Sequence, residues 1–230
     1  MAATAFVLAA GLGTRLRPLT LATPKPLLPV DGLPMLDHVL ALLRRHGHEE
    51  VVVNAHWLSD QIVAWAADKP GVQVSVEPTI LGTGGGLRAA RALLAPRFVI
   101  VNGDILCDVD LSALWAVDAP AVMALRPQAA PVHTGVTLQD GVVTGISGVV
   151  GQASSELHFT GVHVLDRQVL DRIPEGEQCV IRTAYRSLIP EGRVRGRVHL
   201  GRWTDIGTIA EYEAVRDQPF GVDGLTGGVG

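Results

Sequence analysis

Lysine is almost missing from this chain of 230 residues. Lys25 and Lys69 are the only two, so arginine carries most of the positive charge. The formal net charge of -4 and the pI near 6.0 argue against a general nucleic-acid-binding protein, which would present a strongly basic face. Because the chain uses lysine so rarely, a lysine that falls inside a motif becomes a candidate for a specific role.

Cysteine and long apolar runs are also scarce. Cys107 and Cys179 lie far apart without the spacing of metal ligands, which predicts packed thiols in a reducing compartment and no disulfide. No apolar run approaches the roughly 20 residues of a membrane-spanning helix. The apolar N-terminal residues have no basic segment before them, so they predict a buried strand and not a signal peptide. We therefore expect a cytoplasmic protein without membrane or nucleic-acid partners.

The first half of the chain alternates between short apolar runs and segments of helical periodicity. We predict strands at 5–10, 51–54, 72–76 and 98–101, and helices at 34–47, 59–67 and 87–94, the last following a glycine-rich loop at 82–86. This alternation is typical of an α/β fold, in which helices cover a parallel sheet.

Glycines divide the second half into shorter apolar segments. Antiparallel hairpins are expected from strands at 122–125, 135–138, 142–146 and 159–165. Further along we predict helical segments at 169–173 and 179–188, a strand at 194–200, a turn at 203–208 and a closing helix at 209–217. Residues 220–230 are rich in glycine and predict a flexible tail.

A glycine-rich loop follows the first predicted strand directly. Residues 11–17 read Gly-Leu-Gly-Thr-Arg-Leu-Arg. The glycines allow backbone angles that turn N–H groups toward one point, and the guanidiniums of Arg15 and Arg17 suit phosphate oxygens. A Walker loop would end in Gly-Lys-Ser/Thr, and a dinucleotide fingerprint needs a third glycine where Leu16 stands. A plain tight turn explains the glycines but not the arginines, so the loop favours phosphate binding.

Three further charged residues are candidates for the same site. Lys25 stands between two prolines that limit where its backbone can point, and its ammonium can offset phosphate charge. Asp104 follows a predicted central strand, at the edge where α/β sheets hold their ligands. Asp205 lies far along the chain, just before a glycine. Taken singly, each aspartate is at least as well explained as a turn or cap residue.

Five motifs, taken together, decide between these interpretations. They are Gly-Leu-Gly-Thr-Arg-Leu at 11–16, Thr-Pro-Lys-Pro at 23–26, Leu-Gly-Thr-Gly-Gly-Gly at 81–86, Val-Asn-Gly-Asp at 101–104 and Trp-Thr-Asp-Ile-Gly-Thr at 203–208. In order and spacing they resemble the signature of the sugar-1-phosphate nucleotidyltransferases, also called nucleotide-sugar pyrophosphorylases. The resemblance implies a Rossmann-like, mostly parallel mixed sheet with helices on both faces and an antiparallel sugar-binding insertion.

The resemblance also divides the chain. It implies a single domain over 1–219, with a nucleotide-binding part at about 1–118, a sugar-binding part at about 119–200 and a closing turn and helix at about 201–219. It implies that Mg²⁺ is held by Asp104 and Asp205, and that Arg15, Lys25 and Asp104 are catalytic. The residues implied to bind nucleotide are Ala10, Gly11, Gly13, Thr14, Glu77, Gly82, Gly84, Gly85 and Asn102.

Glu77 carries the one argument about the base. A carboxylate there would suit the two N–H donors of guanine better than uracil, but Glu77 could equally position the glycine-rich loop or face solvent. Gly84 and Gly85 are expected to contact the base through their backbone.

Sugar binding is expected from Thr160 and Gly161, because Phe-Thr-Gly at 159–161 resembles the family segment that meets sugar hydroxyls. Glu156 is the candidate for the acid of a Glu-Lys-Pro stretch that many members carry some residues earlier and that this chain lacks. Here the chain departs from the family, since many members hold the sugar phosphate with a lysine and this chain has none after Lys69. Arg182 and Arg186 are candidates to replace it.

The implied substrates are a nucleoside triphosphate and a sugar 1-phosphate, joined with release of pyrophosphate. Guanylyl transfer to mannose or heptose 1-phosphate is the first interpretation, and uridylyl transfer to N-acetylmuramate or another hexose 1-phosphate is the alternative. A non-catalytic nucleotide-sugar sensor would be expected to lack one or more of the charged site residues, and it is disfavoured because this chain has all four, Arg15, Lys25, Asp104 and Asp205. A glycosyltransferase would use Asp-x-Asp, a form that Asp108 and Asp110 have, although a solvated loop and a helix cap explain them as well. Both a monomer and a homodimer are consistent with the sequence.

Overall fold

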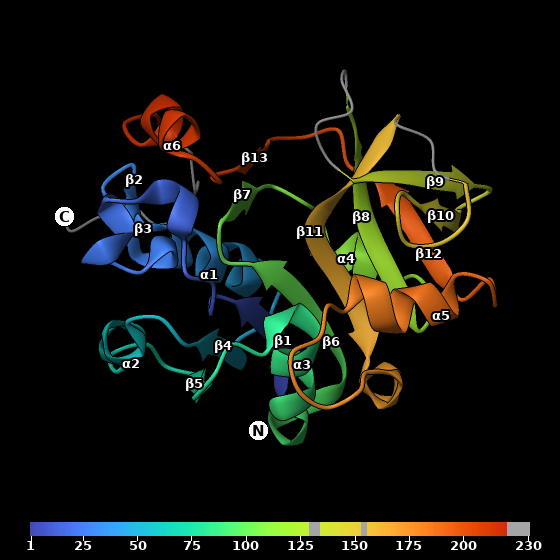
Figure 1. Cartoon of the computed structure of the whole chain (residues 1–230), viewed down its shortest axis with the longest axis horizontal. Coiled ribbons are helices and arrows are strands. Elements are labelled where there is room, and N and C mark those ends of the chain that lie inside the picture. The colour runs from blue at the N-terminus through green and yellow to red at the C-terminus, as the bar shows by residue number, and fades with distance from the viewer. Residues whose placement is uncertain (129–133, 153–155, 220–230) are drawn as a thin grey trace.

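A nine-stranded mixed sheet forms the centre of the molecule (Figure 1). The computed structural model describes residues 1–128, 134–152 and 156–219. Across the sheet the strands are β5 (Val72–Val76), β4 (Val51–Ala55), β1 (Ala3–Leu8), β6 (Leu94–Asn102), β11 (Leu157–Asp166), β8 (Ala121–Pro127), β12 (Val194–Val198), β10 (Val142–Ile146) and β9 (Gly135–Gln139). Two short ribbons pair β2 (Pro29–Val30) with β3 (Leu33–Pro34) and β7 (Ile105–Cys107) with β13 (Trp203–Asp205).

Strands β5, β4, β1 and β6 run parallel, as the alternation of strands and helices in this half of the chain predicted. Ala5 stands opposite Val51 on one side of β1 and opposite Val99 on the other. The parallel half ends at β11, which runs antiparallel to β6 and continues the sheet into the second half of the chain. The mixed α/β class is therefore confirmed, and one sheet spans both halves.

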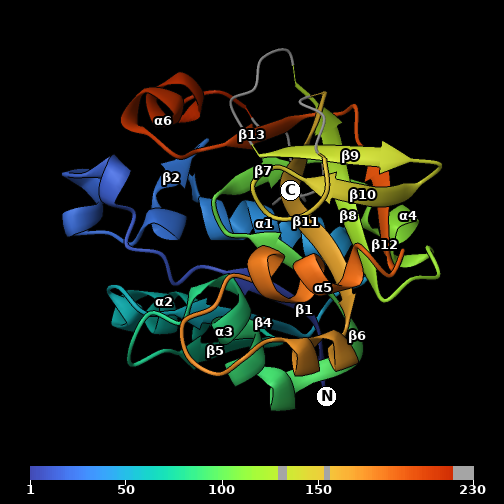
Figure 2. The same cartoon turned by 45° about the vertical axis from the view of Figure 1, so that its right-hand side comes forward.

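The prediction of successive hairpins in the second half was only partly right. Only β9 and β10 form a hairpin among the four strands predicted there, whereas β8 lies between β11 and β12 and pairs with β12 in parallel. Strand β9 also pairs with β11, so the sheet curls back on itself (Figure 2). Alternation in a single strand fixes which face is buried, but it does not say which strand lies alongside.

Helices cover both faces of the sheet, as expected. Side chains of one face, including Phe6 and Phe98, pack with Leu87 of α3 (Gly82–Ala89) and Leu188 of α5 (Arg186–Leu188). The other face packs against three more helices, which are α1 (Met35–Arg45), α2 (Ser59–Ala66) and α4 (Leu111–Trp115). Asp110 caps α4 by accepting a hydrogen bond from the N–H of Ala113 at 2.9 Å, which confirms its predicted role.

Two of the predicted helical segments take tighter or wider forms. Arg167–Arg172 is a 3-10 helix, and Ile181–Tyr185 is a π-type turn that leads into α5. Of the 3-10 turns in the first half, Thr14–Leu16 and Lys25–Leu27 lie within the motifs predicted to bind phosphate.

A third, smaller core joins the two ends of the chain. Leu16, Leu28 and Met35 pack with Ile206 and Tyr212 of the segment around α6 (Ile209–Val215). The Tyr212 hydroxyl donates a hydrogen bond to the Pro29 carbonyl at 2.9 Å. Figure 1 shows the result, with α6 in red lying beside the blue β2–β3 ribbon.

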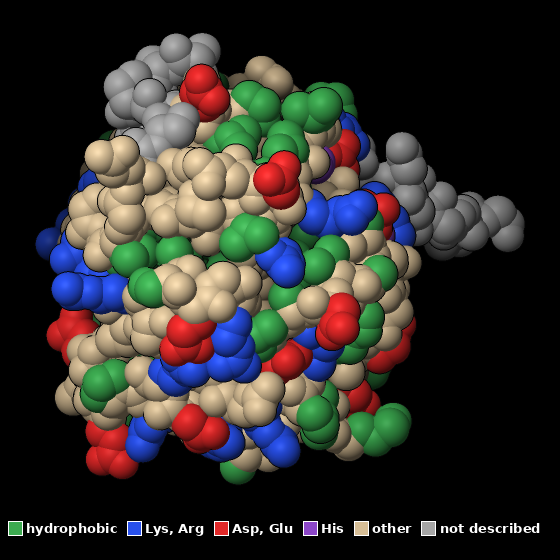
Figure 3. Space-filling view, turned by 90° about the vertical axis from the view of Figure 1, so that its right-hand side faces the viewer, with side chains coloured by type: hydrophobic (Ala, Val, Ile, Leu, Met, Phe, Trp, Pro, Cys, Tyr) green, Lys and Arg blue, Asp and Glu red, His purple; other side chains and the backbone are tan. Residues whose placement is uncertain are grey.

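Basic and acidic side chains are interspersed on the face nearest β9, β10 and β12 (Figure 3). Within the described ranges, no helix is both long enough and apolar enough to cross a membrane. The tail predicted at 220–230 lies outside the described residues.

Candidate active site

The first glycine loop forms a compact turn at the end of β1. Gly13 has a φ of 61°, in the left-handed region that glycine adopts without strain, and it begins the 3-10 turn Thr14–Leu16. The Thr20 hydroxyl donates to the Gly13 carbonyl at 2.8 Å, while the buried Leu16 anchors the turn in the third core. Thr14 and Arg15 are consequently held on the exposed side of the loop.

Arg15 lies directly against the C-terminal motif. Its two terminal nitrogens are each 3.0 Å from where a Cβ would stand on Gly207, so a side chain at position 207 would require the guanidinium to shift. Glu211 fixes Gly207 from the other side, because its Oε2 accepts the Gly207 N–H at 2.9 Å. The structure thus places Arg15 beside the segment that carries Asp205, although the two lie far apart in the sequence.

Lys25 and Asp104 form an ion pair. Lys25 Nζ lies 2.5 Å from Asp104 Oδ2, and their side chains are 11% and 29% exposed. Lys25 sits in a 3-10 turn between prolines, and Asp104 follows the carboxyl end of β6. The charge of the ammonium is therefore held at one fixed point at the edge of the sheet.

Asp205 reaches the same place through the β7–β13 ribbon. It pairs with Ile105, the residue after Asp104, and the Ile206 N–H donates to the Asp104 carbonyl at 3.2 Å. The predicted turn at 203–208 was wrong in its first half, where Trp203–Asp205 form a strand. Three residues are too short to show the alternation by which strands are recognised. The ribbon brings the two aspartates predicted to bind metal to neighbouring positions.

A cavity of about 220 Å³ opens beside Asp104, at the carboxyl ends of β1 and β6. Four of the residues that the resemblance implies to bind nucleotide line it, namely Ala10, Gly11, Gly82 and Asn102. The other residues that line it, beyond Asp104, are Leu8, Asn54, Ile80 and Thr83. Of these, Asn54 is the one that the sequence could have pointed to, since it is a polar residue near the end of a predicted buried strand.

Glu77 does not project into this cavity. It is 3% exposed, and its Oε1 accepts a hydrogen bond from Asn54 Nδ2 at 2.7 Å while its Oε2 accepts one from the Leu81 N–H at 3.0 Å. Of the roles considered for Glu77, positioning the glycine-rich segment fits these contacts. Because both carboxylate oxygens are already engaged within the protein, Glu77 gives no support for guanine.

The prediction of a loop at 82–86 was wrong. These glycines form the first half of α3, which ends at Ala89. Tertiary packing overrides the low helix propensity of glycine. A Cβ on Gly85 would lie 2.2 Å from the Gly176 carbonyl oxygen, so the neighbouring chain fits only against glycine. The N–H groups of Gly84 and Gly85 both point at the Gln178 carbonyl, at 2.7 and 3.4 Å, and the predicted contacts with the base find no free donor there.

The predicted sugar-binding residues are arranged unevenly. Gly161 has a φ of +83° at an irregularity of β11, and a Cβ on it would lie 2.7 Å from Asn102 Nδ2, so it lies against a residue of the cavity. The Thr160 side chain is fully buried and donates to the Ala124 carbonyl at 2.9 Å, so it faces the interior and not a ligand. Glu156 is exposed, as are the two arginines considered as replacements for the missing lysine, Arg182 and Arg186.

The sequence profile of the nucleotidyl transferase family matches residues 4–218. The chain belongs to this family. It is 34% identical over 224 residues to N-acetylmuramate alpha-1-phosphate uridylyltransferase of Neisseria meningitidis, which covers 91% of this chain and 95% of that protein. It is 32% identical over 223 residues to mannose-1-phosphate guanylyltransferase of Mycobacterium tuberculosis, covering 90% of this chain and 62% of that protein. The implied class, a sugar-1-phosphate nucleotidyltransferase, is therefore confirmed.

Solved structures agree on the fold of this nucleotidyltransferase. HddC from Yersinia pseudotuberculosis superimposes with a TM-score of 0.78 at 21% identity, covering 94% of this chain and 98% of that one. A putative glucose-1-phosphate thymidylyltransferase from Bacillus anthracis gives a TM-score of 0.80, also at 21% identity, and covers 92% of each chain. At this identity the likeness speaks for the fold alone.

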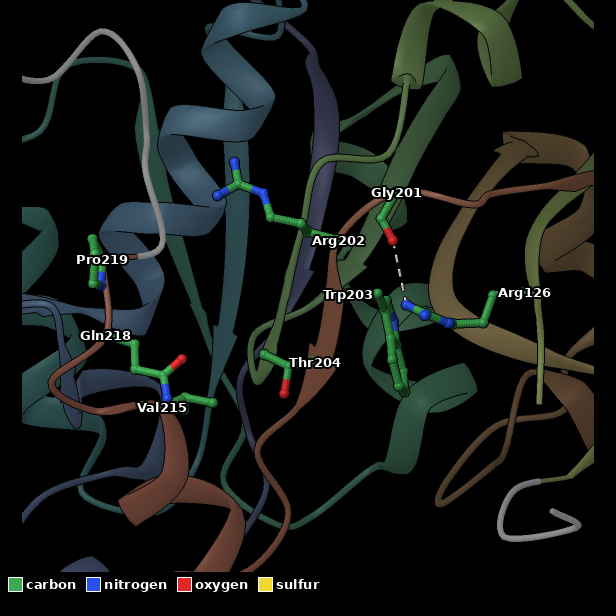
Figure 4. A pocket seen from close by; sticks show the side chains of 8 residues that line it. All are labelled: Arg126, Gly201, Arg202, Trp203, Thr204, Val215, Gln218 and Pro219. Carbon is green, nitrogen blue, oxygen red and sulfur yellow. Dashed lines mark hydrogen bonds between the residues drawn. The ribbon is translucent and has the colours of Figure 1, made fainter. Parts of the chain in front are cut away.

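A second hollow of about 300 Å³ lies along β13 of the nucleotidyltransferase (Figure 4). The Arg126 guanidinium stands 5.5 Å from the centre of the Trp203 ring, and it donates weakly to the Gly201 carbonyl at 3.5 Å. The Trp203 indole N–H donates to the Thr160 carbonyl at 2.8 Å. Trp203 thereby ties the strand that carries Asp205 to the irregular part of β11.

A buried pair with strongly shifted pKa values lies in the core of the enzyme. His163 Nδ1 is 2.6 Å from the Tyr185 hydroxyl, and both side chains are essentially unexposed. Burial lowers the pKa of His163 from 6.5 to about 3 and raises the pKa of Tyr185. Both groups are therefore neutral near pH 7, and neither lines the cavity beside Asp104.

Proposed function

We propose that the enzyme transfers a uridylyl group to N-acetylmuramate 1-phosphate, with Mg²⁺ held by Asp104 and Asp205. The observation that supports the site is the ribbon pairing, which sets Asp205 opposite the residue after Asp104. Two carboxylates at one edge of the sheet, with a cavity beside Asp104 that could take phosphate oxygens and waters, are a donor set that suits Mg²⁺. Bound there, the ion would offset phosphate charge.

The chemistry needs no activated side chain. A phosphate oxygen of the sugar 1-phosphate is already ionised at neutral pH, and it attacks the α-phosphorus as pyrophosphate leaves. Arg15 and Lys25 would orient the triphosphate and offset the charge that develops on it. Ala10, Gly11, Gly13 and Thr14 would surround the phosphates with backbone N–H groups. The base would occupy the cavity beside Gly82 and Asn102.

Uridine is supported by the relative that matches along nearly its whole length. Guanylyl transfer to mannose 1-phosphate is the second candidate, because a mannose-1-phosphate guanylyltransferase is 32% identical to this chain over 62% of its own length. Glu77 does not favour guanine, because its carboxylate bonds only within the protein. We retain Gly161 and Glu156 as candidate contacts with the sugar. Thr160 is not proposed to bind the sugar, because its side chain is buried and bonded to the Ala124 carbonyl.

The contacts of the two aspartates in the Asp-x-Asp sequence disfavour a glycosyltransferase of similar fold. Asp110 caps α4, and Asp108 lies near His199 and Arg202, with its Oδ1 3.2 Å from His199 Nε2. Neither residue lines the cavity beside Asp104.

A turnover panel tests the proposal. Each of four nucleoside triphosphates is incubated with N-acetylmuramate, mannose, heptose and glucose 1-phosphate, and pyrophosphate release is measured with Mg²⁺. The highest kcat/KM is expected for UTP with N-acetylmuramate 1-phosphate. A higher value for GTP with mannose 1-phosphate would establish the second candidate, and pyrophosphate release without any sugar phosphate would reject both.

A further inference from the structure

Two buried polar side chains connect the two walls of the nucleotide cavity. Asn54 is the one polar residue of β4, where its Oδ1 accepts the Ala9 N–H at 2.6 Å and its Nδ2 donates to Glu77 Oε1 at 2.7 Å. Glu77 Oε2 accepts the Leu81 N–H at 3.0 Å. Ala9 leads into the glycine loop and Leu81 precedes α3, so one chain of hydrogen bonds runs from the phosphate side to the base side.

In this series of hydrogen bonds from Ala9 to Leu81, each donor meets an acceptor. An ionised carboxylate only accepts, so Glu77 can satisfy two donors, and the amide of Asn54 supplies the one acceptor and the donor between them. The side chains are 2% and 3% exposed, so the loss of a partner leaves a buried polar group unsatisfied within the protein. An apolar pair at these positions would leave the N–H groups of Ala9 and Leu81 without acceptors.

Helix α3 packs directly onto the pair. A Cβ on Gly86 would lie 2.4 Å from Glu77 Oε1 and 2.8 Å from Asn54 Nδ2. The helix backbone at Gly86 therefore lies directly against these two side chains, and Glu77 also holds the N–H of Leu81, the residue before the helix. Asn54 also borders the cavity, which Glu77 does not.

We propose that Asn54 and Glu77 are positioning residues for nucleotide binding. They fix the separation between the end of β1 and the start of α3, so that one cavity accepts the phosphates and the base together. They act through Ala9 and Leu81, whose backbone they hold. This inference rests on the proposed nucleotidyl transfer and adds a pair of residues to it that contact no reacting atom.

An exchange of chemistry between the two positions tests the pairing. In Glu77→Gln, one donor faces another whichever way the two amides are turned. In Asn54→Asp, two carboxylates face each other. In the double variant Asn54→Asp/Glu77→Gln every donor again meets an acceptor. The new carboxylate at position 54 accepts from Ala9 and from the amide nitrogen introduced at position 77, while the oxygen of that amide accepts from Leu81.

Each single variant is expected to raise the KM for the nucleoside triphosphate roughly tenfold, while the KM for the sugar 1-phosphate stays within about twofold of wild type. The double variant should return the nucleotide KM to within about threefold of wild type. Glu175→Gln is the matched control, since this carboxylate near α3 is 88% exposed and forms its ion pair with Arg88 at the surface. Its KM values should not change.

Binding of the Mg²⁺ complex of UTP or GTP, measured by calorimetry, accompanies the kinetics because it does not require turnover. If wild type binds and turns over but the double variant is as defective as the singles, the inference is wrong and the proposed function stands. Single variants that lower the melting temperature without changing nucleotide affinity would equally overturn it, since they would show a purely structural role. If wild type binds no nucleotide, the proposed function fails. If Glu77→Gln does not fold, the test compares the double variant with Asn54→Asp alone, and the inference requires the double variant to have the lower KM for the nucleoside triphosphate.

Discussion

Lys25→Met removes a positive charge from the candidate site and keeps nearly the length of the side chain. The ammonium lies 2.5 Å from Asp104, and the side chain is 11% exposed, so water screens its charge little. Losing one fixed charge-stabilising group in a site of this kind costs on the order of 10²–10³ in kcat, or about 2.7–4 kcal/mol of transition-state stabilisation. We expect a loss in that range, with a smaller change in KM.

Stability should change much less than activity. The Asp104 side chain is 29% exposed, so its carboxylate reaches water when the lysine is gone. Removing the lysine therefore leaves no carboxylate that is both unpaired and cut off from water, which is the strongly destabilising case. We therefore expect a melting temperature within a few degrees of wild type, which separates a catalytic defect from unfolding.

The only other lysine provides the control. Lys69 pairs with Asp37 at 3.1 Å, lies 5.2 Å from the centre of the Trp65 ring and is 21% exposed. It resembles Lys25 in being largely buried and in having an acidic partner, but it does not border the cavity beside Asp104. Pyrophosphate release at saturating substrates should be unchanged in Lys69→Met. The assignment is refuted if Lys25→Met keeps more than about a tenth of the wild-type kcat, or if both variants lose activity equally.

Three other perturbations have defined outcomes. Gly85→Ala places a methyl group 2.2 Å from the Gly176 carbonyl oxygen, so urea denaturation should show a loss of about 1–3 kcal/mol, whereas Gly11→Ala, which meets nothing within 4 Å, should unfold like wild type. The pKa of His163 is lowered to about 3 in the folded state, so the unfolded chain binds more protons between about pH 6.5 and pH 3. The free energy of unfolding should therefore fall with acidification in that window, by up to about 1.4 kcal/mol per pH unit. His163→Asn should flatten this pH dependence, and an unchanged slope would assign it to other groups. Removing divalent cations with EDTA should stop turnover and leave the melting temperature unchanged, and turnover that survives EDTA would contradict a metal site at Asp104 and Asp205.

The sequence was sufficient for features that depend on neighbouring residues. The strand predicted at 5–10 and the helix predicted from Pro34 follow from local periodicity, and the structure has a strand at Ala3–Leu8 and a helix at Met35–Arg45. The order of the five motifs was enough to assign the family. Cap formation by Asp110 is likewise a local event, and it was predicted correctly.

Features that depend on distant partners were missed. Glycines at 82–86 predict a loop by propensity, and the reason they form a helix is the chain at Gly176 and Gln178, which no local pattern reveals. Glu77 looked available to a base because the sequence does not show that Asn54 reaches it. Strand β13 is only three residues long and exists because β7 lies beside it.

The third core has a consequence for the order in which the molecule assembles. The bond from Tyr212 to Pro29 joins residues 183 apart in the sequence, and closing so long a loop is entropically costly until most of the sheet exists. Leu16 of the glycine loop and Ile206, the residue after Asp205, both belong to this core. During refolding, catalytic activity should therefore return after the sheet has formed, and a nascent chain should gain its phosphate site only once α6 has docked.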